Sequence, residues 1–266
     1  MDIGARELHV VRRGAGEPLL LIHGLGATSG FWGEPFLAAL AAEFDVIAYD
    51  QRGVGASSPS DGPFSIADLA DDAAALLDAL DIDAAHVAGA SMGGMVAQEL
   101  ALRHPGKVRS LVLGCTYAGG EGSTITDRAL LRPYLDAIRS GDVELVARTG
   151  FELNMAPAAR ERPRSYRTYR TLTFAAPVPR AVVIEQARAT ATHDTSARLG
   201  DITAPTTIVH GDLDLMLVVA NARHIAGLVP HARLEIMEGV GHVFWLEEPA
   251  WSARLVIESI RVAVGG

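Results

Sequence analysis

The sequence predicts an α/β protein with a mostly parallel central sheet, helices on both faces and an inserted helical lid. Short runs rich in Val, Ile and Leu alternate with segments of helical periodicity through most of the 266 residues. This alternation is typical of parallel sheets that are covered by helices. It stops between about residues 119 and 198, where every predicted element is a helix. We therefore expect a core of residues 1–118 and 199–266, with residues 119–198 inserted as a helical cap, or lid.

The predicted strands are apolar runs that are too short to form helices. They cover residues 7–13, 18–24, 44–50, 85–90, 108–114, 206–211 and 232–237. Because the carboxyl ends of parallel strands meet at one edge of a sheet, the residues that follow these runs are expected to gather there.

Helical periodicity marks the segments between the strands. In residues 65–80, Ser65 followed by Asp68 resembles a capping box, and apolar residues recur every three or four positions. The other predicted core helices cover residues 91–104 and 247–264, and the predicted cap helices cover residues 125–141, 142–153, about 160–174 and 179–191.

Composition excludes several classes of protein. A net charge of −9 argues against a general nucleic-acid binder, which needs a basic surface. No apolar stretch approaches the roughly 20 residues of a membrane helix, and no signal peptide is visible. Cys115 is the only cysteine, which rules out an intrachain disulfide and suits a reducing cytoplasm. No Cys/His zinc spacing and no phosphate-binding loop is present.

A candidate nucleophile stands between a predicted strand and a predicted helix. The pattern Gly89-x-Ser91-x-Gly93 joins residues 85–90 to residues 91–104. A serine on so sharp a turn is strained and exposed, and flanking glycines remove side chains that would clash with it. The alternative is a glycine-rich turn whose serine only caps the helix.

An activated serine needs a base and an acid that orients the base. His242 follows the last predicted strand, and we predict it to be the base. Asp214 is the favoured acid, with Asp212 as a turn former or second acid. The order Ser91, Asp214, His242 is the order of α/β enzymes with a nucleophile elbow. His210 lies inside a strand and is expected to face the core or a helix.

The amides of Leu25 and Met92 are the predicted oxyanion hole. Met92 begins the helix after the serine, and Leu25 follows His23-Gly24 at the end of another strand. Gly24 and Gly26, with an acidic residue at the end of the next strand, superficially resemble a dinucleotide-binding fingerprint. We disfavour that interpretation because the third glycine is missing and His23 stands where an apolar strand should end.

Five motifs together resemble the α/β-hydrolase fold family, in its serine-nucleophile branch, over nearly the whole chain. They are "HGLG" (23–26), "DQRGVGAS" (50–57), "GASMGG" (89–94), "GDLD" (211–214) and "GHVFWLEEP" (241–249). Residues 89–113 are similar to 3-oxoadipate enol-lactonases, small carboxylesterases and cofactor-free haloperoxidases. The resemblance implies that Asp50 and Arg52 shape a turn and are not catalytic. Relatives commonly have proline four residues after the acid, where this chain has Val218.

The resemblance and the triad predict hydrolysis of a carboxylic ester or lactone of small to medium size through an acyl-enzyme on Ser91. A serine nucleophile disfavours epoxide hydrolases and haloalkane dehalogenases, which use aspartate there. No metal or organic cofactor is expected, and the expected partner is a small-molecule substrate. The alternatives are a C–C hydrolase, lyase, acyltransferase or perhydrolase/haloperoxidase with the same triad, and a receptor-like protein that binds a ligand.

The substrate pocket is the least constrained part of the prediction. Phe31, Trp32 and Trp245 are candidates for an apolar lining, with core packing as an equal alternative. Met92, Phe151, Phe174 and Phe244 are further candidates. Cap arginines offer a site for a substrate carboxylate. However, Lys107 is the only lysine among the 23 basic residues, so arginine is enriched throughout the chain.

Overall fold

A seven-stranded sheet forms the centre of the protein. The computed structural model describes residues 1–176 and 178–265. The strands lie in the order β1-β3-β2-β4-β5-β6-β7; only β1 is antiparallel to its neighbour, and the other pairs are parallel. Their bounds are β1 Val10–Arg13, β2 Pro18–Ile22, β3 Asp45–Tyr49, β4 Ala85–Ala90, β5 Val108–Gly114, β6 Thr206–Gly211 and β7 Arg233–Met237. The predicted fold class is confirmed, although the first strand is shorter than expected.

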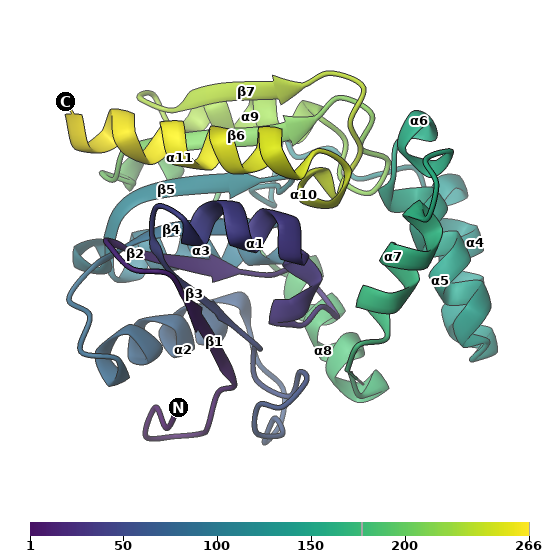
Figure 1. The fold of residues 1–266 in the computed structure, drawn as a ribbon, viewed down its shortest axis with the longest axis horizontal. Helices are drawn as coiled ribbons and strands as arrows, with labels where there is room; N and C mark the ends of the chain where they lie inside the picture. Colours follow the sequence, from purple (N-terminus) through teal and green to yellow (C-terminus); the bar gives the residue numbers. More distant parts are fainter. Residues whose placement is uncertain (177, 266) are drawn as a thin grey trace.

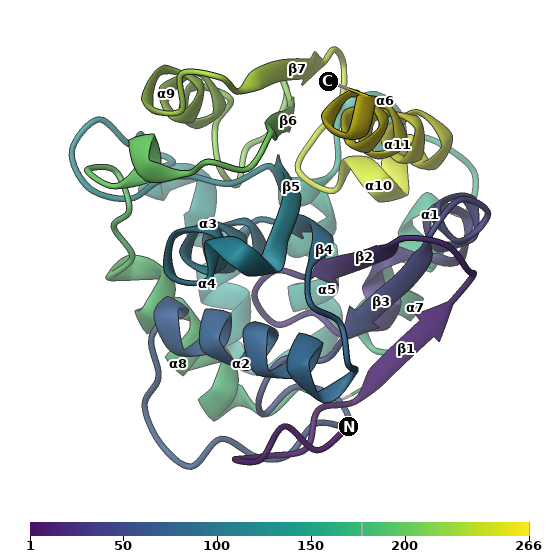
Figure 2. The same ribbon diagram turned by 90° about the vertical axis from the view of Figure 1, so that its left-hand side faces the viewer.

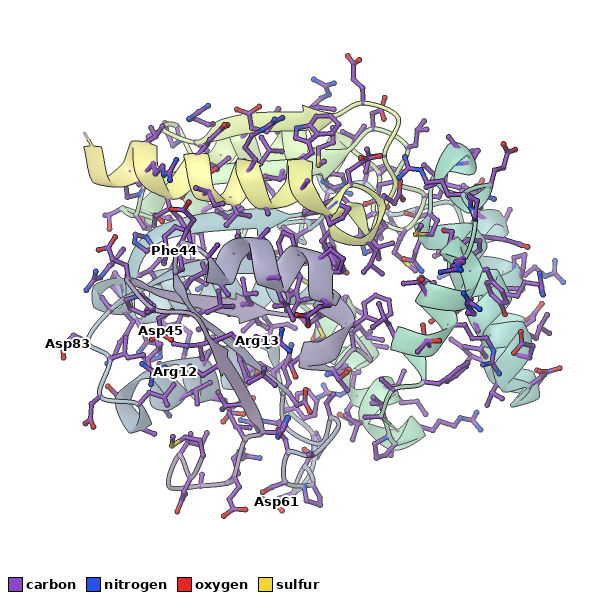
Figure 3. The ribbon with its side chains drawn as sticks, in the orientation of Figure 1. Arg12, Arg13, Phe44, Asp45, Asp61 and Asp83 are labelled. Atoms are coloured by element: carbon purple, nitrogen blue, oxygen red, sulfur yellow. The ribbon has the colours of Figure 1, made fainter. Side chains whose placement is uncertain are left out.

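The antiparallel edge strand β1 is held to β3 by an ion pair as well as by backbone hydrogen bonds. Val10 lies opposite Tyr49 and Arg13 opposite Val46. The Arg12 guanidinium donates to both carboxylate oxygens of Asp45 at 2.6–3.0 Å. This pair lies on the side of the molecule away from the helices of residues 119–198 (Figure 3). Charged side chains on an edge strand discourage pairing with another chain.

Helices cover both faces of the sheet, as the sequence predicts. Figure 2 shows α1 and α11 on one face and α2, α3 and α9 on the other. Outside residues 119–198 the helices are α1 Glu34–Ala41, α2 Ile66–Ala79, α3 Met92–Arg103, α9 Ala220–Leu228, α10 Phe244–Glu247 and α11 Pro249–Gly265, with short 3-10 turns at Ser29–Trp32, Pro105–Lys107 and Leu199–Asp201. The prediction did not include α1 and α9. Their N-caps are Gly33 and Val219, which make no side-chain cap. Helix α1 has Glu34 and Pro35 in its first turn, a start signal that the prediction did not use, whereas α9 has no acidic residue or proline there.

The start of α2 is the capping box that the sequence predicts. The Ser65 hydroxyl accepts from Asp68 N–H at 3.2 Å, and the Asp68 carboxylate accepts from Ser65 N–H at 2.7 Å. The predicted helix at residues 247–264 begins later, at Pro249. The residues before it form the separate short helix α10.

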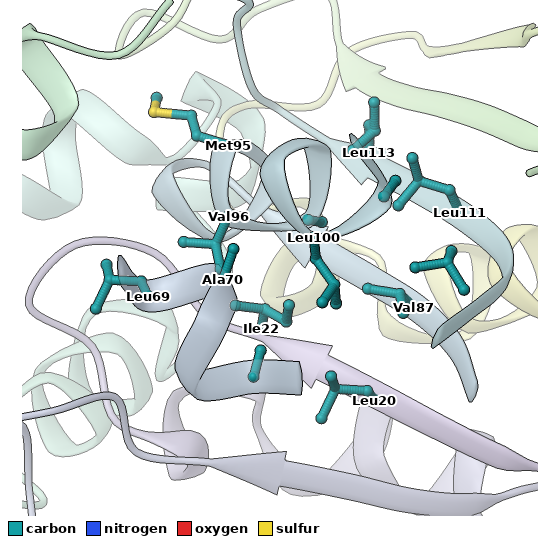
Figure 4. Packing of buried hydrophobic residues seen from close by; sticks show 14 of the residues in the cluster. Leu20, Ile22, Leu69, Ala70, Val87, Met95, Val96, Leu100, Leu111 and Leu113 are labelled. Carbon is teal, nitrogen blue, oxygen red and sulfur yellow. The ribbon is translucent and has the colours of Figure 1, made fainter. Parts of the chain in front are cut away.

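Alternate residues of the central strand β2 supply two hydrophobic cores. Leu20 and Ile22 belong to the cluster under α2 and α3, and Leu19 and Leu21 to the cluster under α1 and α11. Figure 4 shows the first cluster, where Val96 and other residues of α3 lie against the strands. Each helical layer therefore packs on one apolar face of the same sheet. This packing sets the positions of the strand ends.

Residues 119–198, here called the cap segment, leave the sheet after β5 and return before β6. Its two ends lie side by side through a bridge between Gly119 and Asp194. Its helices are α4 Arg128–Ser140, α5 Val143–Asn154, α6 Pro157–Arg160, α7 Ser165–Thr173 and α8 Arg180–Ala191, and its described residues form no regular strand. They lie beyond the ends to which the arrows of β6 and β7 point (Figure 1).

The predicted helix at about 160–174 is wrong in its first part. Arg164 has a left-handed backbone (φ 68°) and follows Pro163, so the helix begins only at Ser165. None of the helices in the described part of the chain is both long and apolar enough to cross a membrane.

Replacing Gly93 by alanine should destabilise the protein strongly. A Cβ there would lie 2.0 Å from the carbonyl oxygen of Ile22, which is backbone and cannot move without shifting β2. We expect Gly93→Ala to lower the free energy of unfolding by about 3 kcal/mol or more in urea titrations. Gly227→Ala in α9 is the matched control, because nothing lies within 4 Å of its Cβ and alanine favours a helix. Equal stability of the two variants would contradict the close approach.

Candidate active site

Ser91 stands on a strained corner between β4 and α3. Its backbone has φ 58° and ψ −124°, a region that side chains rarely adopt. Its N–H donates to the Gly114 carbonyl at 2.9 Å, which ties the corner to β5. A Cβ on Gly89 would lie 2.2 Å from the Gly93 carbonyl oxygen, so only glycine fits there. Packing against neighbouring backbone therefore holds the corner in shape.

The loop after β2 lies directly against Ser91. A Cβ on Gly24 would be 3.0 Å from the Ser91 Cβ. Gly24 N–H donates to His23 Nδ1 at 2.7 Å and Gly26 N–H to Gln186 Oε1 at 2.8 Å. Among the described residues, Leu25 N–H between them has no acceptor within hydrogen-bond reach.

Met92 supplies the second predicted amide. It is the first residue of α3, so its N–H is one of the amides that a helix leaves without an internal acceptor. The positive end of the helix dipole lies at the same point. Two unpaired amides beside a serine suit a developing oxyanion. The assignment of Leu25 and Met92 as the oxyanion hole stays a prediction.

His242 and Asp214 meet at the same edge of the sheet. The distance from His242 Nδ1 to Asp214 Oδ2 is 2.7 Å, and both side chains are buried. The other oxygen, Asp214 Oδ1, accepts from the amides of Met216 and Leu217 at 2.8 and 2.9 Å. Asp214 follows β6 and His242 follows β7, so neighbouring parallel strands bring them together.

Asp212, the alternative acid, is exposed and accepts from Gly239 N–H at 2.7 Å. It therefore shapes the turn, while Asp214 contacts the imidazole. Val218, where relatives commonly have proline, does not prevent the contact between Asp214 and His242.

The charged forms of His242 and Asp214 stabilise each other. Burial by itself lowers the pKa of His242, but the Asp214 carboxylate, with the Cys115 thiol, raises that pKa well above its ordinary value of 6.5. Burial opposes ionisation of Asp214, yet His242 and His210 lower its pKa to about 2. Burial, with the nearby His242, lowers the pKa of His23 to about 3, so His23 is neutral.

His210 was expected to face the core or a helix, and its complete burial agrees with this, but the structure adds a contact that was not predicted. It is fully buried in β6, but its Nε2 lies 3.0 Å from Asp214 Oδ2 and 2.6 Å from the Leu217 carbonyl. The acid therefore contacts two histidines. The spacing of four residues between His210 and Asp214, at the end of a strand, is the only signal in the sequence for this contact.

Cys115 is a neighbour of His242, and no pattern in the sequence indicated this contact. It follows β5 directly, is buried and has a positive φ of 38°. Its thiol lies beside His242, and burial raises the pKa of that thiol. Among the described residues, Ser91 Oγ makes no hydrogen bond to His242. Catalytic hydrogen bonds often shorten only when substrate is bound.

The predicted pocket residues Phe31, Trp32 and Trp245 pack tightly in this structure. All three are buried around His23, at ring distances of 4.6–5.3 Å. Trp245 Nε1–H donates to the Phe31 carbonyl at 3.0 Å. Phe174 is 40% exposed, lies under the Arg170 guanidinium and does not belong to the buried cluster. A role of these aromatics in binding substrate stays a prediction.

A cavity of about 200 Å³ lies at the cap segment, and none of the predicted catalytic or pocket residues line it. Its lining comprises Met155, Ala159, Arg162, Pro163, Ser165, Thr168, Tyr169, Leu246 and Glu247. Cap arginines are paired with protein carboxylates in several places: Arg162 with Glu248, Arg170 with Glu144, Arg188 with Glu185 and Arg198 with Glu99. These pairs leave fewer arginines for a substrate carboxylate.

Comparison with known proteins assigns the family. A family model described as alpha/beta hydrolase fold matches residues 17–249. The chain belongs to the α/β-hydrolase fold family. This confirms the resemblance that the sequence motifs carry.

Relatives and solved structures match over most of the chain. The putative carbamate hydrolase RutD of Variovorax paradoxus (strain S110) is 31% identical over 253 residues, 94% of each chain. The poly(3-hydroxyalkanoate) depolymerase of Ectopseudomonas oleovorans is 31% identical over 257 residues, 92% of this chain and 84% of the relative. The crystal structure of the enol-lactonase from Burkholderia xenovorans LB400 superposes with a TM-score of 0.84 at 25% identity, covering 97% of this chain and 98% of that one. These comparisons support a hydrolase of the α/β-hydrolase fold.

Replacing Asp214 by asparagine should lower the pKa of His242. The substitution removes the carboxylate that raises this pKa and leaves the burial that lowers it. Titration of the histidine ring signals by NMR measures the change. Asp212→Asn is the control and should leave the His242 pKa unchanged, since Gly239 N–H is the partner of the Asp212 carboxylate among the described residues. An unchanged pKa in Asp214→Asn would refute the electrostatic pairing.

Proposed function

We propose that the protein is a serine hydrolase that cleaves a carboxylic ester or lactone of small to medium apolar substrates through an acyl-enzyme on Ser91. The observation that carries this proposal is the strained backbone turn at Ser91, between β4 and α3. A strained serine stands beside a helix N-terminus, and the buried His242–Asp214 pair lies at the same sheet edge. A merely structural turn has no need of that strain.

In the proposed reaction, Ser91 Oγ attacks the substrate carbonyl and His242 takes the hydroxyl proton. Asp214, bound to Nδ1, fixes the imidazole tautomer so that Nε2 is the basic atom. The amides of Leu25 and Met92 bind the oxyanion, and loss of one such donor typically costs about 10²–10³-fold in rate. His242 then protonates the leaving alcohol, and water cleaves the acyl-enzyme by the same route.

The substrate class is inferred from the surroundings of the serine and from relatives. The aromatic side chains of Phe31, Trp32 and Trp245 lie around His23, in the loop next to Ser91. These side chains favour an apolar acyl or alcohol group. The named relatives include a depolymerase of a polyester, an enol-lactonase and a putative carbamate hydrolase. In ester, lactone and carbamate alike, the carbonyl carries an oxygen or nitrogen leaving group. No step of the proposed mechanism needs a cofactor, a nucleic acid or a membrane.

Hydrolysis of p-nitrophenyl esters with two to twelve acyl carbons, beside a p-nitrophenyl carbamate, tests the proposal. We expect turnover by the wild type and a fall of at least about 10³-fold in Ser91→Ala, because the nucleophile is lost. Ser60→Ala removes a hydroxyl that binds only the Gly62 carbonyl and should keep full activity. Turnover that survives in Ser91→Ala would contradict the assignment, and a preference for the carbamate would change the substrate class.

The pH profile should follow the protonation of His242. Only neutral imidazole can accept the serine proton, and the pKa of His242 is raised above 6.5. Activity should therefore be low in acid and rise through an apparent pKa above 6.5 as the pH increases. The measurement is kcat/KM from pH 5 to pH 10. A rise centred below 6.5 would show that the carboxylate does not raise the pKa of the base.

A further inference from the structure

We propose that the cap segment positions two catalytic loops, with Glu247 and Gln186 as the positioning residues. The two loops are residues 238–243, which carry His242, and residues 23–26, which carry Leu25. The inference rests on the proposed serine hydrolase function, and it gives the cap segment a part in aligning the reacting groups.

The first junction is centred on the Glu247 carboxylate. Glu247 Oε1 accepts from Ala156 N–H at 2.9 Å, in the cap segment, and from Gly241 N–H at 3.1 Å. Oε2 lies 3.2 Å from the same Gly241 amide. The residue is only 4% exposed, so water does not compete for these bonds. One buried carboxylate therefore joins Ala156, the N-cap of α6, to the residue directly before His242.

The residue after His242 is bound by the cap segment as well. Val243 N–H donates to the Asn154 carbonyl at 3.2 Å. A Cβ on Gly241 would lie 2.8 Å from both the Asn154 oxygen and the Ala156 nitrogen. The two backbones are thus in direct contact, and His242 is anchored on both sides by residues 154–156.

Hydrogen bonds add to the packing at this junction, which has empty space on one side. The cavity of about 200 Å³ borders it and is lined by Met155, Tyr169, Leu246 and Glu247. Arg162 donates to the Glu247 carbonyl oxygen at 2.5 Å. Burial raises the pKa of Glu247, and the amides of Ala156 and Gly241 oppose that rise. With space on one side, the loss of the carboxylate bonds would leave the His242 loop free to shift.

The second junction holds the loop after β2. Gly26 N–H donates to Gln186 Oε1 of α8 at 2.8 Å, and Gln186 is fully buried. At the other end of the loop, Gln51 Nε2–H donates to the His23 carbonyl at 2.6 Å. Leu25 therefore lies between one anchor from the core and one from the cap segment.

The two junctions have a shared consequence. Ser91 is fixed by backbone packing within the core, whereas the loops that carry the base and one oxyanion amide are held partly from the cap segment. A displacement of about 1 Å in a reacting group can cost about 10²-fold in rate. Loosening the cap segment should therefore lower kcat and not only weaken substrate binding.

Glu247→Ala and Gln186→Leu test the two junctions. We expect kcat on the best p-nitrophenyl ester to fall by about 10–100-fold in each, with KM within about threefold of the wild type. Glu247→Gln keeps one acceptor oxygen for the Ala156 and Gly241 amides and should recover part of kcat. Glu247→Ala should also speed hydrogen exchange at the amides of Gly241 and Val243, a readout that does not depend on turnover.

Two matched controls remove cap contacts that do not involve the catalytic loops. They distinguish positioning of these loops from attachment of the cap segment to the core. Glu248→Gln breaks the exposed Arg162 ion pair next to Glu247. Arg188→Gln removes the bond from α8 to the Phe64 carbonyl (2.8 Å). Both should keep kcat and amide exchange near wild-type values.

Three results would overturn the inference: unchanged kcat in Glu247→Ala and Gln186→Leu, an equal fall in the controls, or unchanged exchange at Gly241 and Val243 in Glu247→Ala. If the wild type hydrolyses no ester, the proposed function fails. The exchange measurement still decides whether Glu247 holds the His242 loop, and unchanged exchange would overturn the inference in that case too.

Discussion

The close approach of α3 to β2 is the constraint on which the site depends. Gly93 lies so near the carbonyl oxygen of Ile22 that no side chain fits between them. Gly89 is confined almost as closely against the helix, and Gly24 lies near Ser91 with a little more space. Because three backbones meet here without side chains, Ser91 is forced into a conformation that a relaxed turn would avoid. The strain is sustained by the packing of the two hydrophobic cores on either side of the sheet.

A buried carboxylate organises the other half of the site. Asp214 is buried from solvent, and two histidines and two backbone amides contact its carboxylate oxygens. These contacts outweigh the cost of burial and keep the group ionised. Its charge in turn favours protonation of His242. Asp214 is the main group that raises the pKa of the base, with the Cys115 thiol beside it. Asp214 and His242 come from loops that follow neighbouring parallel strands.

The sequence predicted those features that depend on short segments, such as the strands and the residues that directly follow them. Most strands are apolar runs, and Ser91, Asp214 and His242 follow strands whose carboxyl ends must share an edge, so the fold and the His242–Asp214 contact could be predicted. Helix α9 could not, since it has no capping side chain and no acidic residue in its first turn; α1 was missed although Glu34 and Pro35 mark its start.

The junctions between the cap segment and the catalytic loops could not be predicted either. Glu247 lies 91 positions from Ala156, and Gln186 lies 160 from Gly26. Both depend on how the cap segment docks. The candidate pocket aromatics also pack against one another, and hydrophobicity alone does not distinguish a pocket lining from a core.

The role of Ser91 as nucleophile is tested most directly by mapping the covalent adduct that an alkyl fluorophosphonate forms with the wild-type protein. Intact mass spectrometry gives the stoichiometry, and peptide mapping gives the modified residue. We expect one adduct per chain, located on Ser91 and absent from Ser91→Ala. No adduct, or an adduct on another residue such as the buried thiol of Cys115, would contradict a serine nucleophile at this corner.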